Sequence, residues 1–203
     1  MPDHNQFWFY LFLVPFLLLA GCTIFSPVPS HSTKTYVLNA DPQPITKKSK
    51  RSIDLFITPT RAEAGYNTAD MVYTNKPLEM AYFANHAWAE PPATLLPNLI
   101  RQTLQKTHYY HSVNSAFLIG HADMILNTEL VKLNQDFLSH PSTVNLILQA
   151  QLVNANTNRI MSTKQFSFTE PALQATPEAG VVAANQAVEK LLLQLAEFCL
   201  KNS

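Results

Sequence analysis

Glycine and cysteine are scarce in this chain of 203 residues, and the lack of glycine counts against two classes of enzyme. Only four glycines occur, so the glycine-rich loops that cradle phosphate groups are absent. No Gly-x-Ser-x-Gly segment occurs either, which removes the sharp turn that presents the serine nucleophile in a large class of hydrolases. The sequence therefore favours neither a nucleotide-binding enzyme nor a hydrolase of that class.

The chain also lacks an excess of charge of either sign. The chain has 14 basic and 14 acidic residues, so its formal net charge is zero. A nucleic-acid-binding protein normally carries a basic excess that attracts the phosphate backbone. We therefore expect no nucleic acid among the partners of this protein.

A short apolar run near the start of the chain ends in a distinctive four-residue segment. The run extends from Phe7 to Leu19 and is too short to cross a bilayer, which needs about 20 apolar residues. It closes with Leu19-Ala20-Gly21-Cys22, in which two small residues precede a cysteine. This is the pattern of a lipoprotein signal peptide over residues 1–21, cleaved between Gly21 and Cys22. The alternatives are an ordinary cleaved signal or an uncleaved anchor helix, with Cys22 present by chance.

Lipidation of Cys22 would set the organisation of the rest of the chain. The expected groups are a diacylglycerol on the sulfur and an acyl chain on the new amino terminus, and no other cofactor is predicted. Residues 22–35 contain Pro27, Pro29 and several Ser and Thr, which is typical of a flexible tether. Residues 36–203 then form one domain. With Cys22 modified, Cys199 has no disulfide partner, so stability must come from burial.

The hydrophobic pattern of the domain predicts strands followed by helices. Alternation of apolar and polar residues is clearest from Val144 to Leu152, while helical spacing runs over 92–106 and 177–200. Further strands are predicted at 36–38, 53–58, 71–73, 78–83, 122–137 and 160–169, with 71–73 and 78–83 forming a hairpin. We expect an α+β fold: a two-layer domain with a mainly antiparallel sheet of about seven strands and two long amphipathic helices on one face.

Two groups of side chains resemble reaction centres. His108 and His111 could bind a metal from one helix face, but no acidic or thiol ligand lies nearby, so surface or capping roles fit better. Asp123, Glu129 and Asp136 would be spread along a strand at roughly 3.3 Å per residue, too far apart for acid and base catalysis. We assign no catalytic residue and no metal ligand.

Two aromatic residues are candidates for a partner interface. Trp88 precedes the first predicted helix, where an indole either plugs the space between helix and sheet or anchors another subunit. Tyr82, six residues earlier, has the same two interpretations.

Taken together, several segments resemble the ABC-type transport auxiliary lipoproteins, which accompany lipid transporters with MCE domains. They are, in order, Tyr36-Val37-Leu38, Tyr82 with Trp88-Ala89-Glu90-Pro91-Pro92, Ala122-Asp123-Met124 to Leu130 with Gln135-Asp136-Phe137, Ala150-Gln151-Leu152-Val153, and Gly180-Val181-Val182-Ala183-Ala184-Asn185-Gln186-Ala187. Their order covers nearly the whole domain.

The resemblance implies a protein without enzymatic activity. It would dock an MCE-domain protein and its ABC permease and ATPase at the periplasmic face of the outer membrane, and it could form a homo-oligomer. Thr23, rather than Asp, follows Cys22, which is similar to the sorting signal for the outer membrane. The main alternative is an outer-membrane lipoprotein that assembles or plugs a β-barrel protein, and a lipid-anchored hydrolase is a third hypothesis.

Overall fold

The computed structural model describes residues 32–43, 49–115 and 122–203. The chain divides into two compact units, Met1–Ser32 and Thr33–Ser203. All the helices and strands in the described residues belong to the second unit.

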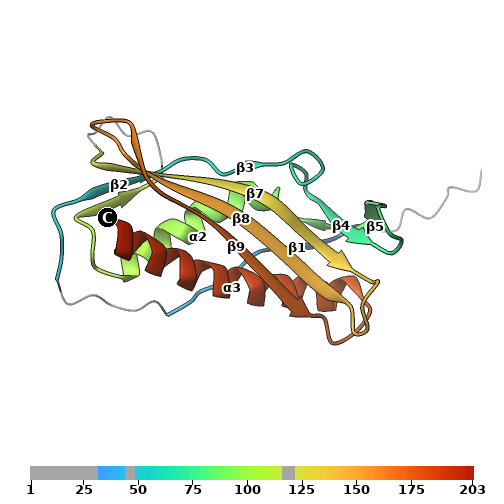
Figure 1. Ribbon diagram of the computed structural model, residues 1–203. Helices are drawn as coiled ribbons and strands as arrows, with labels where there is room; N and C mark the ends of the chain where they lie inside the picture. Colours follow the sequence, from blue (N-terminus) through green and yellow to red (C-terminus); the bar gives the residue numbers. More distant parts are fainter. Residues whose placement is uncertain (1–31, 44–48, 116–121) are drawn as a thin grey trace, which may run out of the picture. The chain divides into compact units, whose positions relative to one another are not determined.

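Three long antiparallel strands form the main part of the sheet (Figure 1). They are β7 (Met124–Asp136), β8 (Thr143–Asn154) and β9 (Arg159–Pro171). In β8 every second residue from Val144 to Leu152 is buried, as the alternating sequence predicts, because neighbouring side chains point to opposite faces of a sheet. The strands predicted at 122–137 and 160–169 are also confirmed.

Strand β7 is the centre of the sheet. It pairs with β8 on one side, and on its other side with three short parallel strands that follow one another along its length. These are β2 (Asp54–Ile57), β3 (Arg61–Ala62) and β4 (Asp70–Thr74). Strand β4 pairs with β5 (Ala81–Trp88) in an antiparallel hairpin, and β1 (Lys34–Tyr36) adds to β5 in parallel. Strand β6 (Ser112–Asn114) adds to β2, also in parallel.

The sheet corrects the predicted fold in two respects. In the part of the chain that the structure describes it has nine strands rather than about seven, and it is mixed rather than mainly antiparallel. Strands β3 and β6 are only two and three residues long, too short to show a period. Parallel partners come from distant parts of the chain, so no hairpin signal announces them. The predicted hairpin is confirmed, although its second strand runs from Ala81 to Trp88 rather than over 78–83.

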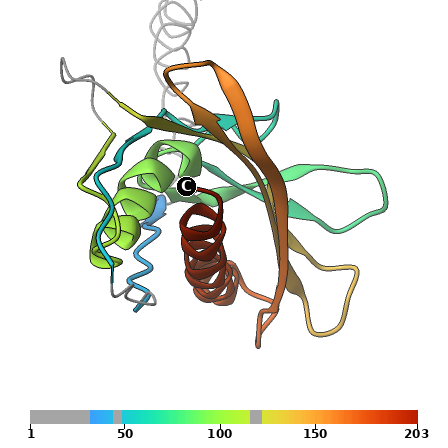
Figure 2. The same cartoon turned by 60° about the vertical axis from the view of Figure 1, so that its left-hand side comes forward.

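Two helices in the described residues cover one face of this sheet (Figures 1 and 2). They are α2 (Pro92–Lys106) and α3 (Pro177–Asn202), which match the predicted helices closely. Both begin with proline, whose missing N–H is not needed in a first helical turn. Thr176 caps α3, because its side chain accepts a hydrogen bond from the backbone N–H of Ala179. The α+β class with two layers is therefore correct.

Small residues bring the first turns of α3 close to the sheet. Ala183, Ala184 and Ala187 are buried, and at Gly180 an added methyl group would overlap Oε1 of Gln135 on β7. The Gln135 amide donates hydrogen bonds to Ser142 Oγ at 3.2 Å and to the Thr176 carbonyl at 3.1 Å. Its Oε1 accepts no hydrogen bond within the described residues. Only a glycine at position 180 leaves room for this buried amide.

Candidate docking site around the first strand

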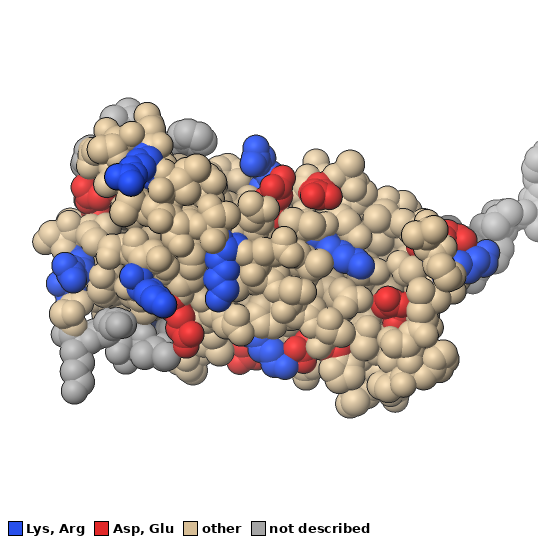
Figure 3. Space-filling view, in the orientation of Figure 1, with Lys and Arg blue, Asp and Glu red and all other residues tan. Residues whose placement is uncertain are grey.

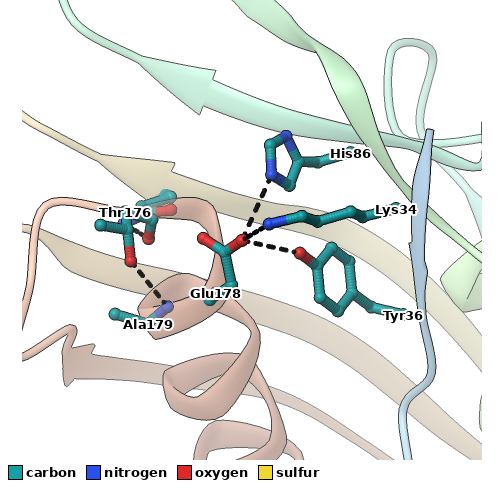
Figure 4. Close-up of polar contacts among 7 residues, drawn as sticks. Lys34, Tyr36, His86, Thr176, Glu178 and Ala179 are labelled. Atoms are coloured by element: carbon teal, nitrogen blue, oxygen red, sulfur yellow. Dashed lines mark hydrogen bonds and ion pairs between the residues drawn. The ribbon is translucent and has the colours of Figure 1, made fainter. Parts of the chain in front are cut away.

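A single carboxylate at the start of α3 gathers three side chains from two other elements (Figure 4). Oε1 of Glu178 lies 2.7 Å from Nζ of Lys34 and 3.1 Å from the hydroxyl of Tyr36, which donates to it. Nε2 of His86 lies 3.4 Å from the same oxygen. These four residues, which we call the Glu178 cluster, therefore connect β1 and β5 to α3.

Local structure explains why these residues meet. In β1 the side chains of Lys34 and Tyr36 point to the same face, because they are two residues apart. The parallel register places Lys34 opposite His86 on β5, so that His86 lies on that face as well. Glu178 is in the first turn of α3, where the positive end of the helix dipole favours a carboxylate.

The electrostatics of the cluster favour a structural role over catalysis. The hydrogen bond and charge of Lys34 lower the pKa of Glu178 from 4.5 to about 2, and Glu178 in turn raises the pKa of Lys34. Glu178 therefore stays ionised at neutral pH and is a poor general acid or base. What the arrangement does is hold the first strand of the domain in place.

A row of aromatic rings continues from this cluster across the sheet. Tyr36 stacks on His86 with ring centroids 6.0 Å apart, and His86 meets Phe83 edge to face at 6.0 Å. The ring centroids of Phe83 and of Tyr73, on β4, are 4.5 Å apart, and both rings contact Phe137 just after β7. Such pairs add roughly 0.5–1.5 kcal/mol each beyond burial. The row joins β1, β5, β4 and the end of β7 into one structure.

The two aromatic residues predicted as interface candidates have different environments. Trp88 is the last residue of β5 and is only 6% exposed, packed into the core, which fits the interpretation as a structural plug. Tyr82 is 45% exposed on the same strand. Its contact with a partner stays a prediction.

The other polar candidates are separated in the structure. Nδ1 of His111 lies 2.8 Å from Asp54, whereas His108 has a positive φ of 53° just beyond α2. Within the described ranges, no group of three His, Cys, Asp or Glu side chains could hold a metal ion. Asp123, Glu129 and Asp136 follow the length of β7 as the sequence indicates, so the structure does not bring them together.

A polar hollow of about 360 Å³ lies over the middle of the sheet. Thr58, Arg61, Asn127, Glu129, Gln149 and Gln151 are among the residues that line it. Figure 3 shows one face of the domain, where acidic and basic side chains are scattered rather than gathered into a patch of one sign. The hollow offers hydrogen bonds to a partner, but it contains no paired nucleophile and base.

Sequence reasoning did not single out Lys34, His86 or Glu178 as a site. Thr176-Pro177-Glu178 carries a helix-start signal, with a capping residue, a proline and an acidic residue in the first turn. Its partner Lys34 is 144 residues away, however, and no local pattern links the two. Gly21 and Cys22, the predicted cleavage and lipidation residues, lie outside the described residues.

None of the helices in the described ranges is both long enough and apolar enough to cross a bilayer.

Comparison with solved structures shows which folds this one is similar to. Protein XCC0632 from Xanthomonas campestris has a TM-score of 0.76 at 16% identity, over 83% of this chain and 96% of that one. The hypothetical protein CT253 from Chlamydia trachomatis has a TM-score of 0.56 at 4% identity, over 75% and 98%. At these identities the likeness concerns the fold alone.

Comparison of the sequence with known proteins gives the family. No curated protein matches the chain. The model of a family described as the ABC-type transport auxiliary lipoprotein component matches residues 36–196, from the Tyr36 of the Glu178 cluster almost to the end of α3. The chain therefore belongs to the ABC-type transport auxiliary lipoprotein family.

Proposed function

We propose that this protein is the lipid-anchored accessory component of an MCE-type ABC lipid transport system. It docks the transporter at the periplasmic face of the outer membrane, so that lipids pass between the two membranes. The observation that carries the proposal is the family match over residues 36–196, which makes the chain an auxiliary component of ABC-type transport. The Leu19-Ala20-Gly21-Cys22 segment supports anchoring through Cys22, and Thr23 supports outer-membrane sorting.

The Glu178 cluster suits a domain that is held by its amino-terminal end. A lipid anchor at Cys22 would connect to the domain through the residues that precede β1. Any pull between membrane and docked transporter would then act first on Lys34 and Tyr36. Their hydrogen bonds to Glu178 and the parallel pairing of β1 with β5 resist that pull together. The first strand is thus fixed to the last helix rather than left as a loose end.

Affinity purification tests the proposed partner. The full-length chain with a carboxy-terminal tag is expressed in its own host, and detergent-solubilised envelopes are passed over the affinity resin. We expect mass spectrometry to identify an MCE-domain protein together with an ABC permease. The Cys22→Ser variant is the matched control, and it should leave the outer-membrane fraction. Recovery of a β-barrel protein without any MCE-domain protein would instead support the assembly-factor hypothesis.

The oligomeric state stays a prediction. Light scattering on the purified lipidated protein in detergent would measure the mass of the complex directly. A mass equal to that of one chain would remove the homo-oligomer from the proposal while leaving the docking role intact.

A further inference from the structure

Five large hydrophobic side chains are exposed on three neighbouring loops and one strand end. They are Leu78, Met80, Tyr82, Leu138 and Leu173, and together they define what we call the apolar end of the domain. Leu78 is completely exposed, and Leu173 is 87% exposed. Such side chains are normally buried, so a group of them at one place marks a binding surface.

The strand register places these side chains at one end of the sheet. Thr74 pairs with Asp136, Asp136 with Thr143, and Thr143 with Pro171. The loops that carry Leu78, Leu138 and Leu173 each follow one of these paired residues within four positions. Figure 1 shows the β4–β5 hairpin and the end of β7 at the same end of the domain. Three separate loops at one end of the sheet therefore carry exposed apolar side chains.

The chain also enters the domain at the apolar end. Strand β1 runs parallel to β5, with Lys34 opposite His86 and Tyr36 opposite Trp88. Because the two strands are parallel, the start of β1 faces the side where β5 begins, although Lys34 itself pairs five residues beyond Ala81. Ala81 comes shortly after the turn that contains Leu78. The amino-terminal connection and the exposed hydrophobic side chains thus share one end of the domain.

Charged side chains at this end are largely paired with each other. Lys34 lies against Glu178, and Nζ of Lys76 lies 3.4 Å from Glu79 in the β4–β5 turn. Asp136 accepts a hydrogen bond from the backbone N–H of Leu138 at 2.8 Å. The surface therefore has no strong net charge and fits an electrically neutral apolar partner better than a highly charged one.

We propose that the apolar end rests on the membrane surface, with its leucines and Met80 in the boundary between head groups and acyl chains of zwitterionic phospholipids. Tyr82 would lie at the level of the head groups, where tyrosine is enriched in membrane proteins. Tyr82 would then contact lipid rather than another subunit. The inference rests on the proposed anchoring through Cys22.

The length of the tether favours this orientation over the reverse. The 11 residues between Cys22 and Lys34 give 12 steps along the chain, which reach at most about 40 Å when fully extended. Strand β7 has 13 residues and spans about 40 Å from one end of the sheet to the other. The opposite end, with Met161, could reach the bilayer only if the whole tether were stretched along the domain. The apolar end meets the bilayer with the tether slack.

The backbone conformation at Leu78 indicates that this residue serves binding rather than the stability of the fold. Glu79 donates a backbone hydrogen bond to the Lys76 carbonyl, which closes a turn with Pro77 and Leu78 in the middle. Leu78 has a positive φ of 63°, a position where glycine or asparagine is favoured. A fully exposed leucine in a strained backbone contributes nothing to the stability of the domain. Its presence is explained if the leucine contacts lipid.

Depth-dependent fluorescence quenching tests the proposal on the lipidated full protein. A Leu78→Cys variant carries an environment-sensitive dye and is reconstituted into phosphatidylcholine and phosphatidylethanolamine vesicles with spin-labelled lipids. Cys199 is buried and does not compete for the dye. Met161→Cys, half exposed at the opposite end, is the matched control. We expect quenching at position 78 to exceed that at position 161 several-fold, and to be unchanged when anionic lipid is added.

Equal quenching at positions 78 and 161 in protein that floats with the vesicles would overturn the membrane contact and leave the anchoring intact. A dye spectrum that shifts with protein concentration in the absence of lipid would assign the apolar end to a second copy and also overturn it. Failure of the protein to float with the vesicles would refute the anchoring through Cys22, and the inference would fail with it. The three results are distinguishable in one experiment.

Discussion

Nζ of Lys34 lies 2.7 Å from Oε1 of Glu178, although 144 residues separate the two in the chain. One residue belongs to the first strand of the domain and the other to the first turn of its last helix. The pair therefore connects the place where the chain enters the domain to the element that completes it.

Replacing Glu178 should change the response of the protein to acid. The folded pKa of Glu178 is about 2, below its usual 4.5, so its contribution to stability is present above pH 4.5 and is lost as the pH falls toward 2. Urea unfolding of Glu178→Gln should show a weaker pH dependence than the wild type in that window. Glu189→Gln, exposed further along α3, is the control and should keep the wild-type slope. An unchanged slope in Glu178→Gln would contradict the assignment.

Gly180→Ala should destabilise the protein, against the usual trend. In an ordinary helix this change stabilises by about 1 kcal/mol. Here the new methyl group meets Oε1 of Gln135 and forces that buried amide away from Ser142 and Thr176. We expect a net loss of about 2 kcal/mol in the free energy of unfolding. Val182→Ala, exposed on the same helix, should change it little.

Combining Gly180→Ala with Gln135→Ala provides the check on the cause. The smaller side chain at position 135 removes the overlap, so the two changes together should cost less than the sum of the two alone. Strict additivity in denaturant unfolding would show that Gly180 matters for another reason.

Leu78→Asn should make the domain more stable. The positive φ of Leu78 costs a leucine about 1 kcal/mol that asparagine largely avoids, and the leucine side chain makes no compensating burial. Thermal unfolding of the variant should therefore occur at a higher temperature. If the apolar end rests on lipid, the same variant should bind vesicles less well, so stability and membrane contact would change in opposite directions. A fall in the unfolding temperature would contradict the account of this turn.

Cys199 should be inert toward thiol reagents in the folded protein. It is completely buried on α3, and burial raises its pKa to about 12. Alkylation at pH 8 should therefore proceed only as fast as the carboxy-terminal part of α3 opens, and denaturant should accelerate it strongly. Rapid labelling in native buffer, followed by mass spectrometry, would show that this part of the helix is not packed as described.

Lys190→Met should leave a buried carboxylate without its partner. Both oxygens of Glu170, on β9, lie within 2.7 Å of Nζ of Lys190, and Glu170 is only 7% exposed. We expect a loss of about 2 kcal/mol in the free energy of unfolding. Lys190→Met combined with Glu170→Leu should recover most of this loss, because no unpaired charge then remains. No recovery in the double variant would indicate that the packing of Lys190, rather than its charge, matters.

Patterns within a single element determined much of this fold. The alternation from Val144 to Leu152 predicted β8, and helical spacing predicted α2 and α3 almost to the residue. Such patterns are readable because the side chains of one strand or helix face the same core, so one period repeats along the segment. The segment that ends in Cys22 is of the same local kind, and it alone supplied the hypothesis of a lipid anchor.

What only the tertiary structure decided are the relationships between distant segments. The parallel pairing of β1 with β5, the meeting of Lys34 with Glu178 and the burial of Trp88 depend on how the elements pack. The gathering of Leu78, Leu138 and Leu173 at one end has the same origin. Pairing energies arise between residues that the chain separates by many positions, and a local period carries no record of its partner. The sequence therefore determined which elements form, while packing decided which side chains share a surface.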